Sequence, residues 1–211
     1  MTPCWGWRRK YRCSIPLWGP IASLAQSGQR LAAAPDEAQL KRVFGAIEGR
    51  MAHLAGFVDG YSRFAKLPLP RLAPVEWRAF LESLRAMTPF EADGQWPRGT
   101  VHLDESQMQQ VLLNLLRNSA EAGSPAAEIR VGVVAHGGGW RLTVADRGAG
   151  MSDEVLANAL LPFYSTKATG TGLGLTLCRE IVEAHGGTID LANREGGGLI
   201  VRLSLPGGLS P

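Results

Sequence analysis

A glycine-rich stretch at positions 170–175, with the sequence GTGLGL, is the part of the chain best suited to hold a ligand. Three glycines occupy every second position and lead into an apolar helical pattern: Gly170, Gly172 and Gly174. Glycine permits a positive φ and a close approach of the backbone, and a helix N-terminus offers unpaired N–H groups to a phosphate. A polar run just before it adds two hydroxyls and a cation: Ser165, Thr166 and Lys167. The stretch predicts a phosphate site, although taken alone it also fits a turn that only redirects the chain.

Two asparagines, Asn114 and Asn118, stand four residues apart within QVLLNLLRNSAEA. This spacing places both carboxamides on one face of an otherwise apolar helix. A buried carboxamide must be hydrogen-bonded, so the pair could serve the fold alone. The alternative is an oxygen ligand for Mg²⁺ carried on phosphates, because Mg²⁺ prefers oxygen atoms and takes few ligands from the protein.

A carboxylate at a strand end is the third candidate. Asp146 follows an expected strand and is itself followed by Gly148 and Gly150. An ionised carboxylate only accepts hydrogen bonds, so it suits an exocyclic amine such as that of adenine. The pattern Asp-x-Gly-x-Gly is, by itself, frequent in turns. Further on, the aromatic run PFY at 162–164 could form a hinge or fill the core.

The elements that must position these residues lie between Pro70 and residue 206. Asp104 and Gln107 match a capping box, with Asp in the Ser/Thr place, and open a helix that runs through Ala122. Alternating apolar residues predict β-hairpins at 129–145 and 188–205. The helix after the glycine run ends before Gly186. We also expect a strand start at 72–77, a helix at 78–87, turns at 88–99 and a short extended segment at 100–103.

The first third of the chain differs from the rest in its composition and in its expected secondary structure. A helix is expected at 21–33, followed by a longer one in which eight apolar residues from Leu40 to Ala65 alternate steps of four and three. This spacing is typical of a seam between packed helices. Pro68 and Pro70 end the helix, so we expect a domain boundary there. Residues 1–19 are rich in Trp, Cys and Arg, show no period and are expected to be irregular.

Composition narrows the class of protein. The 211 residues are 45% hydrophobic, enough for a buried core. No run reaches the roughly 20 apolar residues that span a bilayer. Three cysteines without metal-ligand spacing favour a reduced, cytoplasmic compartment, and Cys178 lies in a helical pattern that indicates the core. The net charge of +3 depends on four basic residues within positions 1–19, and the remainder is slightly acidic. This balance argues against nucleic-acid binding.

Taken together, in this order and at these spacings, the motifs resemble the Bergerat-type (GHKL) ATP-binding domain of sensor histidine kinases. QVLLNLLRNSAEA corresponds to the N box of that family, VADRGAGM to the G1 box, PFYSTK to the F box and GTGLGL to the G2 box. The sequence PFYSTKATGTGLGLTLCREIVEAHGG is most similar to that of kinases of the nitrogen-regulation type. The resemblance implies an α/β (α+β) two-layer sandwich over residues 70–206, with helices on one face of a mixed sheet. Residues 20–68 resemble part of the family's dimerisation and histidine-phosphotransfer hairpin, which would precede the sandwich.

The resemblance also implies a role for each motif. Asn118 would hold Mg²⁺, with support from Asn114. Asp146 would bind adenine, while Gly148 and Gly150 let the base approach. Residues 152–169 would form a lid over ATP, with Lys167 near the phosphates. The backbone beneath the phosphates would be that of the G2 box: Gly170, Thr171, Gly172, Leu173 and Gly174. Related ATPases of the gyrase and heat-shock type place a glutamate at the position of Asn114 to activate water. Asparagine cannot act as that base, which favours a kinase over a hydrolase.

The chain departs from the family at the phospho-acceptor. The sequence GPIASLAQSGQRL resembles the half of the first hairpin helix that follows the acceptor, which places the acceptor position near Arg12. None of the four histidines precedes the usual Glu-x-x-Asn, and we expect all of them to be structural or surface residues: His53, His102, His136 and His185. We therefore assign no acceptor histidine and expect residues 1–19 not to be the native lead-in.

The implied activity is that of an ATP-dependent protein-histidine kinase of a two-component system. It would use ATP and Mg²⁺, have a response regulator as partner and form a homodimer through the hairpin. Its location would be cytoplasmic, alone or within a membrane-associated kinase. Two alternatives remain open: a non-catalytic ATP-binding and dimerisation module, and a Ser/Thr kinase of the anti-sigma type with the same ATP fold. The expected hairpin argues against the second.

Overall fold

The computed structural model describes residues 38, 40–49, 51, 67–167 and 170–207. The chain divides into two compact units, residues 1–56 and 57–211. In the first unit, residues 40–49 are helical, as predicted for that part of the apolar seam. Residues 1–19, the helix expected at 21–33 and the part of the seam after Met51 lie outside the described residues. The dimerisation hairpin and its boundaries therefore stay predictions.

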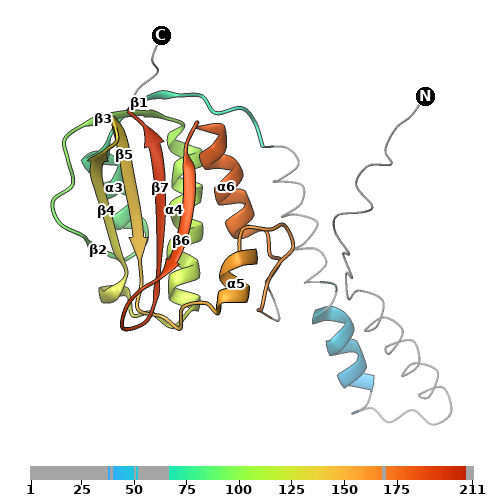
Figure 1. Cartoon of the computed structure of the whole chain (residues 1–211). Coiled ribbons are helices and arrows are strands. Elements are labelled where there is room, and N and C mark those ends of the chain that lie inside the picture. The colour runs from blue at the N-terminus through green and yellow to red at the C-terminus, as the bar shows by residue number, and fades with distance from the viewer. Residues whose placement is uncertain (1–37, 39, 50, 52–66, 168–169, 208–211) are drawn as a thin grey trace, which may run out of the picture. The chain divides into compact units, whose positions relative to one another are not determined.

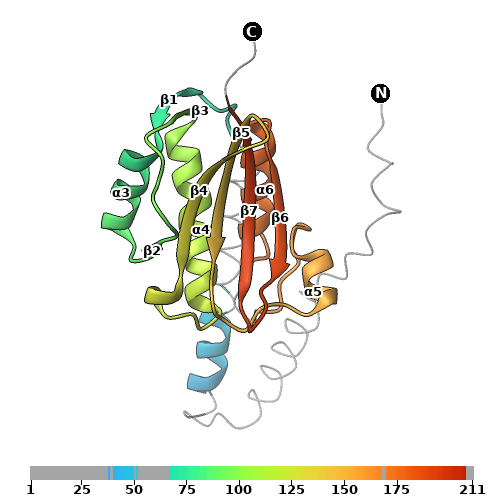
Figure 2. The ribbon, with the colours of Figure 1, turned by 60° about the vertical axis from the view of Figure 1, so that its left-hand side comes forward.

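The second unit contains a five-stranded mixed sheet with helices against one face (Figure 1). In sheet order its strands are β2 (Glu91–Ala92), β4 (Arg130–His136), β5 (Gly139–Ala145), β7 (Leu199–Pro206) and β6 (Thr188–Asn193). The helices are α3 (Trp77–Met87), α4 (Glu105–Glu121), the 3₁₀ turn η2 (Ala126–Glu128), α5 (Asp153–Asn158) and α6 (Gly174–Ala184). Figure 2 shows α4 and α6 side by side behind the sheet, with α3 beside α4. This arrangement confirms the predicted sandwich.

A second, two-stranded sheet joins β1 (Ala73–Glu76) to β3 (Thr100–Leu103) in antiparallel register. β3 leads directly into α4, whose N-cap is Asp104. The Asp104 carboxylate accepts hydrogen bonds from the backbone N–H of Gln107 at 3.1 Å and from that of Arg71 at 3.0 Å. The predicted cap is therefore present, and it also holds the segment that precedes β1.

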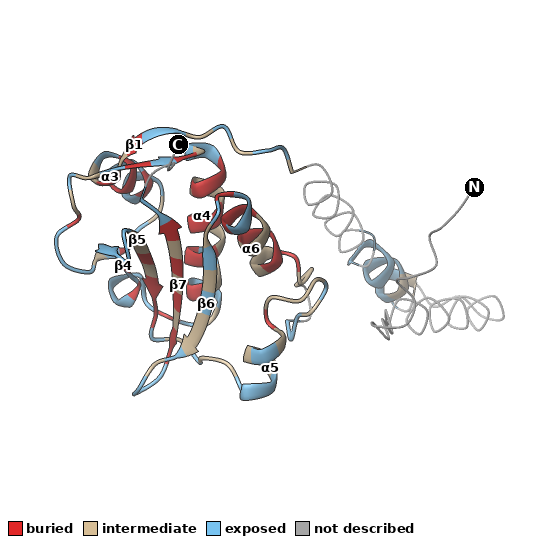
Figure 3. Cartoon of the chain, turned by 45° about the horizontal axis from the view of Figure 1, so that its top comes forward, coloured by how far each residue is buried: buried red, intermediate tan, exposed pale blue. Residues whose placement is uncertain are grey.

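The core lies between the sheet and the pair α4 and α6, where buried residues gather (Figure 3). One face of α4 is buried at helical spacing: Gln107, Met108, Val111, Leu112, Leu115, Leu116 and Ser119. On β7 the burial alternates along the strand, as expected for a strand with one face against the helices. Both predicted hairpins, β4–β5 and β6–β7, pair as antiparallel ladders.

Besides the 3₁₀ turn η2, two elements were not foreseen. The segment 88–99 was expected to consist of turns, but it contains β2, which pairs in parallel with β4 at the edge of the sheet. Backbone bonds hold β2 in place, from Glu91 N to Ile129 O at 2.8 Å and from Asp93 N to Val131 O at 2.9 Å. The other element is α5, which lies within the expected lid and is capped by the Ser152 hydroxyl. Both are too short to produce a readable hydrophobic period.

Within the ranges that the structure describes, every helix is too short or too polar to cross a bilayer.

Candidate functional site

Asp146 lies at the end of β5 and is 4% exposed. Its Oδ1 accepts hydrogen bonds from the backbone N–H of Gly148 at 2.9 Å and of Leu199 at 3.0 Å. Its Oδ2 accepts from the Ser119 hydroxyl at 3.0 Å. Two carboxylate oxygens offer about four acceptor positions. Three of them are taken by the protein, so the carboxylate is held in one orientation and can still accept from one further donor.

The loop after β5 packs closely on the C-terminal end of α4. A side chain at Gly148 would place its Cβ 2.6 Å from the Ala122 carbonyl oxygen, and the Ala149 N–H donates to that oxygen at 3.0 Å. On the other side, a Cβ at Gly198 would lie 2.1 Å from the Asp146 carbonyl oxygen. Glycine at 148 is therefore required by the contact with α4, a physical reason that the sequence did not reveal.

The turn between β6 and β7 closes over the same loop. Arg194 donates from Nη1 to the Asp146 carbonyl oxygen at 2.7 Å. The Asn193 carboxamide binds Met151 twice, accepting from its N–H at 2.9 Å and donating to its carbonyl at 2.6 Å. Sequence reasoning missed these two residues and Ser119 as partners of the site. All three act across at least 27 residues of chain.

Asn114 and Asn118 lie on α4, as the spacing predicted. The Asn114 Oδ1 accepts from Arg117 Nη2 at 3.2 Å, and a Cβ added to Gly174 would lie 4.0 Å from it. The Asn114 side chain therefore lies next to the first residue of α6. The Asn118 side chain is half-buried and has no hydrogen bond among the described residues. Its carboxamide oxygen is available to a ligand.

Cys178 lies one turn into α6, fully buried beside Asn114. Burial raises the pKa of its thiol to about 12, outweighing a contact with the Asn114 side chain that lowers it. The Sγ donates weakly to the Val111 carbonyl at 3.7 Å. A thiol with this pKa is protonated at neutral pH and unreactive, so the prediction of a core cysteine is confirmed.

The glycine run is fastened to the aromatic segment before it. Gly172 has φ +66°, and a Cβ there would lie 2.5 Å from the Phe163 carbonyl carbon. Phe163 itself has φ +65° and donates from its N–H to the Gly172 carbonyl at 3.0 Å. Phe163 is 41% exposed, so it does not fill the core. Of the three glycines of this run, Gly172 alone has a positive φ, and Gly174 starts α6.

The N-terminus of α6 has no side-chain cap. Leu173 occupies the N-cap position without a capping hydrogen bond, and the helical bonds begin with Leu177 N to Leu173 O at 2.8 Å. The first N–H groups of a helix have no partner within it, and they carry the positive end of the helix dipole. This end of α6 therefore suits an anion, as predicted.

Lys167 contacts α4 through an ion pair. Its Nζ lies against Glu121 Oε2, at the last residue of the helix, and Arg117 Nε lies 3.7 Å from the other carboxylate oxygen. α4 therefore contacts three parts of the candidate site: the loop after β5, the segment that carries Lys167 and the start of α6. The contacts come from a short stretch of that helix and its C-cap: Asn114, Ser119, Glu121 and Ala122.

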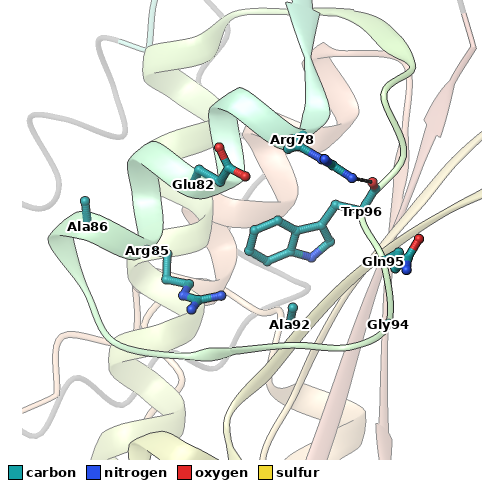
Figure 4. A pocket seen from close by; sticks show the side chains of 8 residues that line it. All are labelled: Arg78, Glu82, Arg85, Ala86, Ala92, Gly94, Gln95 and Trp96. Atoms are coloured by element: carbon teal, nitrogen blue, oxygen red, sulfur yellow. Dashed lines mark hydrogen bonds between the residues drawn. The ribbon is translucent and has the colours of Figure 1, made fainter.

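A hollow of about 500 Å³ lies elsewhere, between α3 and the segment after β2 (Figure 4). Arg78 and Arg85 project from α3 toward it, and Arg78 donates to the Trp96 carbonyl at 3.5 Å. None of the predicted nucleotide-binding residues lines this hollow. We therefore keep it apart from the candidate site.

The described histidines are structural or exposed, as predicted. His185 is buried, and its Nε2 accepts from the Asp104 N–H at 3.0 Å, so Nδ1 is the nitrogen that donates to the Ile181 carbonyl at 2.7 Å. This ring is neutral and joins the end of α6 to the start of α4. His102 and His136 are exposed, and His53 lies outside the described residues. Within the described ranges, no group of three or more His, Cys, Asp and Glu residues is placed to hold a metal.

Comparison with known proteins places these features among ATPases. Residues 103–208 match the family described as histidine kinase-, DNA gyrase B- and HSP90-like ATPase. The C4-dicarboxylate transport sensor protein DctS of Rhodobacter capsulatus is 34% identical in an alignment of 204 positions that covers 88% of this chain and 31% of DctS. The sensor histidine kinase ZraS of Escherichia coli strain K12 is 41% identical over 106 residues, which are 50% of this chain and 23% of ZraS.

Solved structures agree with the fold. The nucleotide-free catalytic domain of the histidine kinase ThkA superposes with a TM-score of 0.57 at 27% sequence identity, covering 65% of this chain and 97% of that domain. The chain spans under a third of the length of both curated relatives.

Proposed function

Because this chain belongs to the family of histidine kinase-, DNA gyrase B- and HSP90-like ATPases, and its domain is of the histidine-kinase catalytic type, we propose that it binds Mg-ATP and transfers the γ-phosphate to a histidine. The observation that carries the proposal is Asp146. This carboxylate is buried and fixed by three donors, and it keeps one acceptor position for an amine. A site built in this way selects a ligand that can donate a hydrogen bond from a flat base.

The carboxylate of Asp146 accepts from the exocyclic amine of adenine in this proposal. Gly148 and Gly150 present no side chains at their own positions in the neighbouring loop, and Gly150 has φ +68°, which favours glycine at that position. Leaving a buried acceptor without a donor is costly. Binding should therefore discriminate adenine from a base that presents a carbonyl at the same place.

The residues present fit Mg²⁺ on the phosphates. Asn118 carries a half-buried carboxamide without a partner in the described part of the chain, and an amide oxygen is a ligand that this hard cation accepts. Asn114, held by Arg117, supports it from the preceding turn. When bound, the ion would supply charge neutralisation at the phosphates. The chain itself contributes the position of the Asn118 oxygen.

The phosphates would lie at the uncapped start of α6, with Lys167 supplying a cation. Phosphoryl transfer depends mainly on positioning and charge stabilisation, and both are what these groups offer. Asn114 stands where related hydrolases have a glutamate, and an asparagine does not take a proton from water. This residue favours transfer to an acceptor over hydrolysis.

The acceptor histidine would belong to another chain. None of the four histidines precedes Glu-x-x-Asn, so we propose that this chain acts on an intact kinase in a mixed dimer, with a response regulator as the downstream partner. The same lack of an acceptor motif favours a second candidate, an ATP-binding and dimerisation module without catalysis.

The two candidates differ in one measurement. The chain is incubated with γ-labelled Mg-ATP, alone and with a histidine kinase that carries an intact acceptor but a disabled ATP site. Acid-labile label on the added kinase supports the transferase. Mg-ATP binding without any transfer supports the module. If the chain binds neither ATP nor ADP, both proposals are wrong.

A further inference from the structure

Glu121, the last residue of α4, joins two cations. Arg117, one turn earlier in the same helix, has its Nε 3.7 Å from Oε1. Lys167, 46 residues further along the chain, has its Nζ against Oε2. The side chains of Lys167 and Glu121 are 43% and 46% exposed, so water reaches the pair.

The stability of the helix does not explain this acid. A carboxylate at the C-terminal end of a helix faces the negative end of the dipole, which is unfavourable. The last turn of α4 contains no basic residue, and Arg117, one turn earlier, reaches Glu121 only through an exposed ion pair. An exposed ion pair contributes about 1 kcal/mol or less to folding. The position of Glu121 is therefore better explained by what it does to Lys167.

Glu121 continues the row of side chains that face the nucleotide site. Asn114, Asn118 and Glu121 are spaced by four and three residues, which places them along one stripe of α4. Arg117 joins this row, because its Nη2 donates to Asn114 Oδ1 at 3.2 Å. The amine of Lys167 is thus held about one helical turn beyond the carboxamide proposed to hold Mg²⁺.

We propose that Glu121 competes with the γ-phosphate of ATP for Lys167. Without nucleotide, the carboxylate holds the amine, and when Mg-ATP binds, Lys167 moves from Glu121 to the terminal phosphate. Arg117 stays with Glu121, so the carboxylate keeps one cation after the exchange. ADP lacks the terminal phosphate and leaves the Lys167–Glu121 pair in place. Glu121 is therefore a positioning residue that sets how strongly the site distinguishes ATP from ADP. This inference rests on the proposed function.

The test is Glu121→Gln in the full chain, with the dissociation constants of Mg-ATP and Mg-ADP measured by calorimetry. Removing the competing charge should tighten Mg-ATP binding by about 2- to 5-fold, the range expected for one exposed ion pair. Mg-ADP binding should stay unchanged. Adding Lys167→Met to Glu121→Gln should abolish the gain, because no amine remains to be released.

Glu105→Gln is the matched control, since Glu105 is an exposed acid on the same helix, sixteen residues before Glu121 and roughly 24 Å away at helical rise. It should change neither affinity. If Glu121→Gln weakens Mg-ATP binding, or shifts ATP and ADP equally while the wild type binds both, the inference is wrong and the proposed function stands. If the wild type binds neither nucleotide, both fail together.

Discussion

Asp146 accepts hydrogen bonds on both of its carboxylate oxygens, whereas an asparagine could accept on only one side. In Asp146→Asn the carboxamide oxygen can still accept from the N–H groups of Gly148 and Leu199, and the new NH₂ can donate to the Ser119 oxygen. The fold should survive, but the position offered to adenine becomes a donor. We expect ATP affinity to fall by about 10- to 100-fold, as for a hydrogen bond to a charged group, in calorimetric titrations.

Thermal melting of the same variant provides the control. An unchanged Tm together with unchanged ATP affinity would mean that the nucleotide does not contact Asp146. A loss of both would show only that the buried carboxylate is needed for folding. Ser119→Ala then separates the cases, because it removes one donor to Oδ2 and leaves the carboxylate itself.

Asn118→Ala should act through the metal. Its carboxamide has no partner in the described part of the chain, so the fold should not depend on it. We expect Mg-ATP binding to weaken by roughly tenfold, the scale of losses at metal sites, while adenosine binding stays the same. Titrations of both ligands, with and without a chelator, measure the difference. Equal losses for the two would contradict a metal role.

At this scale the sequence identified the candidate residues but not their partners. The spacing of Asn114 and Asn118 could be interpreted because both are on one helix. Ser119 is buried, and its hydroxyl donates to a carboxylate 27 residues away. Arg194 and Glu121 were also missed, since their contacts depend on how distant segments pack. No local period carries that information.

Among the elements, α4 depends for its stability on the N-cap residue Asp104. Asp104 caps the helix and also holds Arg71, so Asp104→Ala should destabilise the domain by about 1 kcal/mol or more. Urea unfolding followed by circular dichroism measures the loss. Ser152→Ala removes the cap of the six-residue α5 and is the comparison. It should leave the global transition in place, and a larger effect than that of Asp104→Ala would contradict the importance given to α4.

The same N-cap predicts that the stability of the domain depends on pH. Burial alone would raise the pKa of Asp104, but hydrogen bonds from the Arg71 backbone, from Ser106 and from the Gln107 backbone outweigh it, and the pKa lies below the ordinary 3.8. A depressed folded pKa stabilises the protein above the unfolded value, and the gain is lost as pH falls through the folded value. Below about pH 4 the free energy of unfolding should therefore decrease, and the decrease should be smaller in Asp104→Asn.

Elements with a clear period were predicted well. Both hairpins and helices α4 and α6 follow apolar spacing that the fold uses directly. β2 was missed because two residues make no alternation, and its parallel pairing with β4 is set by contacts across the sheet edge. α5 was missed because its six residues include no fully buried side chain, so there was no apolar stripe to find.

For the whole chain, the proposed acceptor in trans gives a direct expectation. Incubated alone with γ-labelled Mg-ATP, the chain should carry no acid-labile label, because none of its histidines has the acceptor setting. A chain in which residues 12–16 are replaced by His-Glu-x-x-Asn on a regular helix, extended upstream by roughly three to four turns, should label itself. Label on His53, His102, His136 or His185 of the unchanged chain, located by mass spectrometry, would contradict this.

At this scale the family and the sandwich were accessible from the sequence because four motifs occur in order over residues 110–175. The homodimer and the hairpin at 20–68 remain predictions. The described helical residues in that region show exposed apolar side chains at Phe44 and Met51, which lie on the predicted seam.

The concentration of contacts on one end of α4 has a consequence for protein engineering. The loop after β5, the segment that carries Lys167 and the start of α6 each contact α4 within residues 114–122. If these loops were grafted onto another scaffold without this helix, they would keep their motif sequences but lose the contacts with α4 that hold them in place. The unit of transfer between proteins is therefore the helix together with its loops.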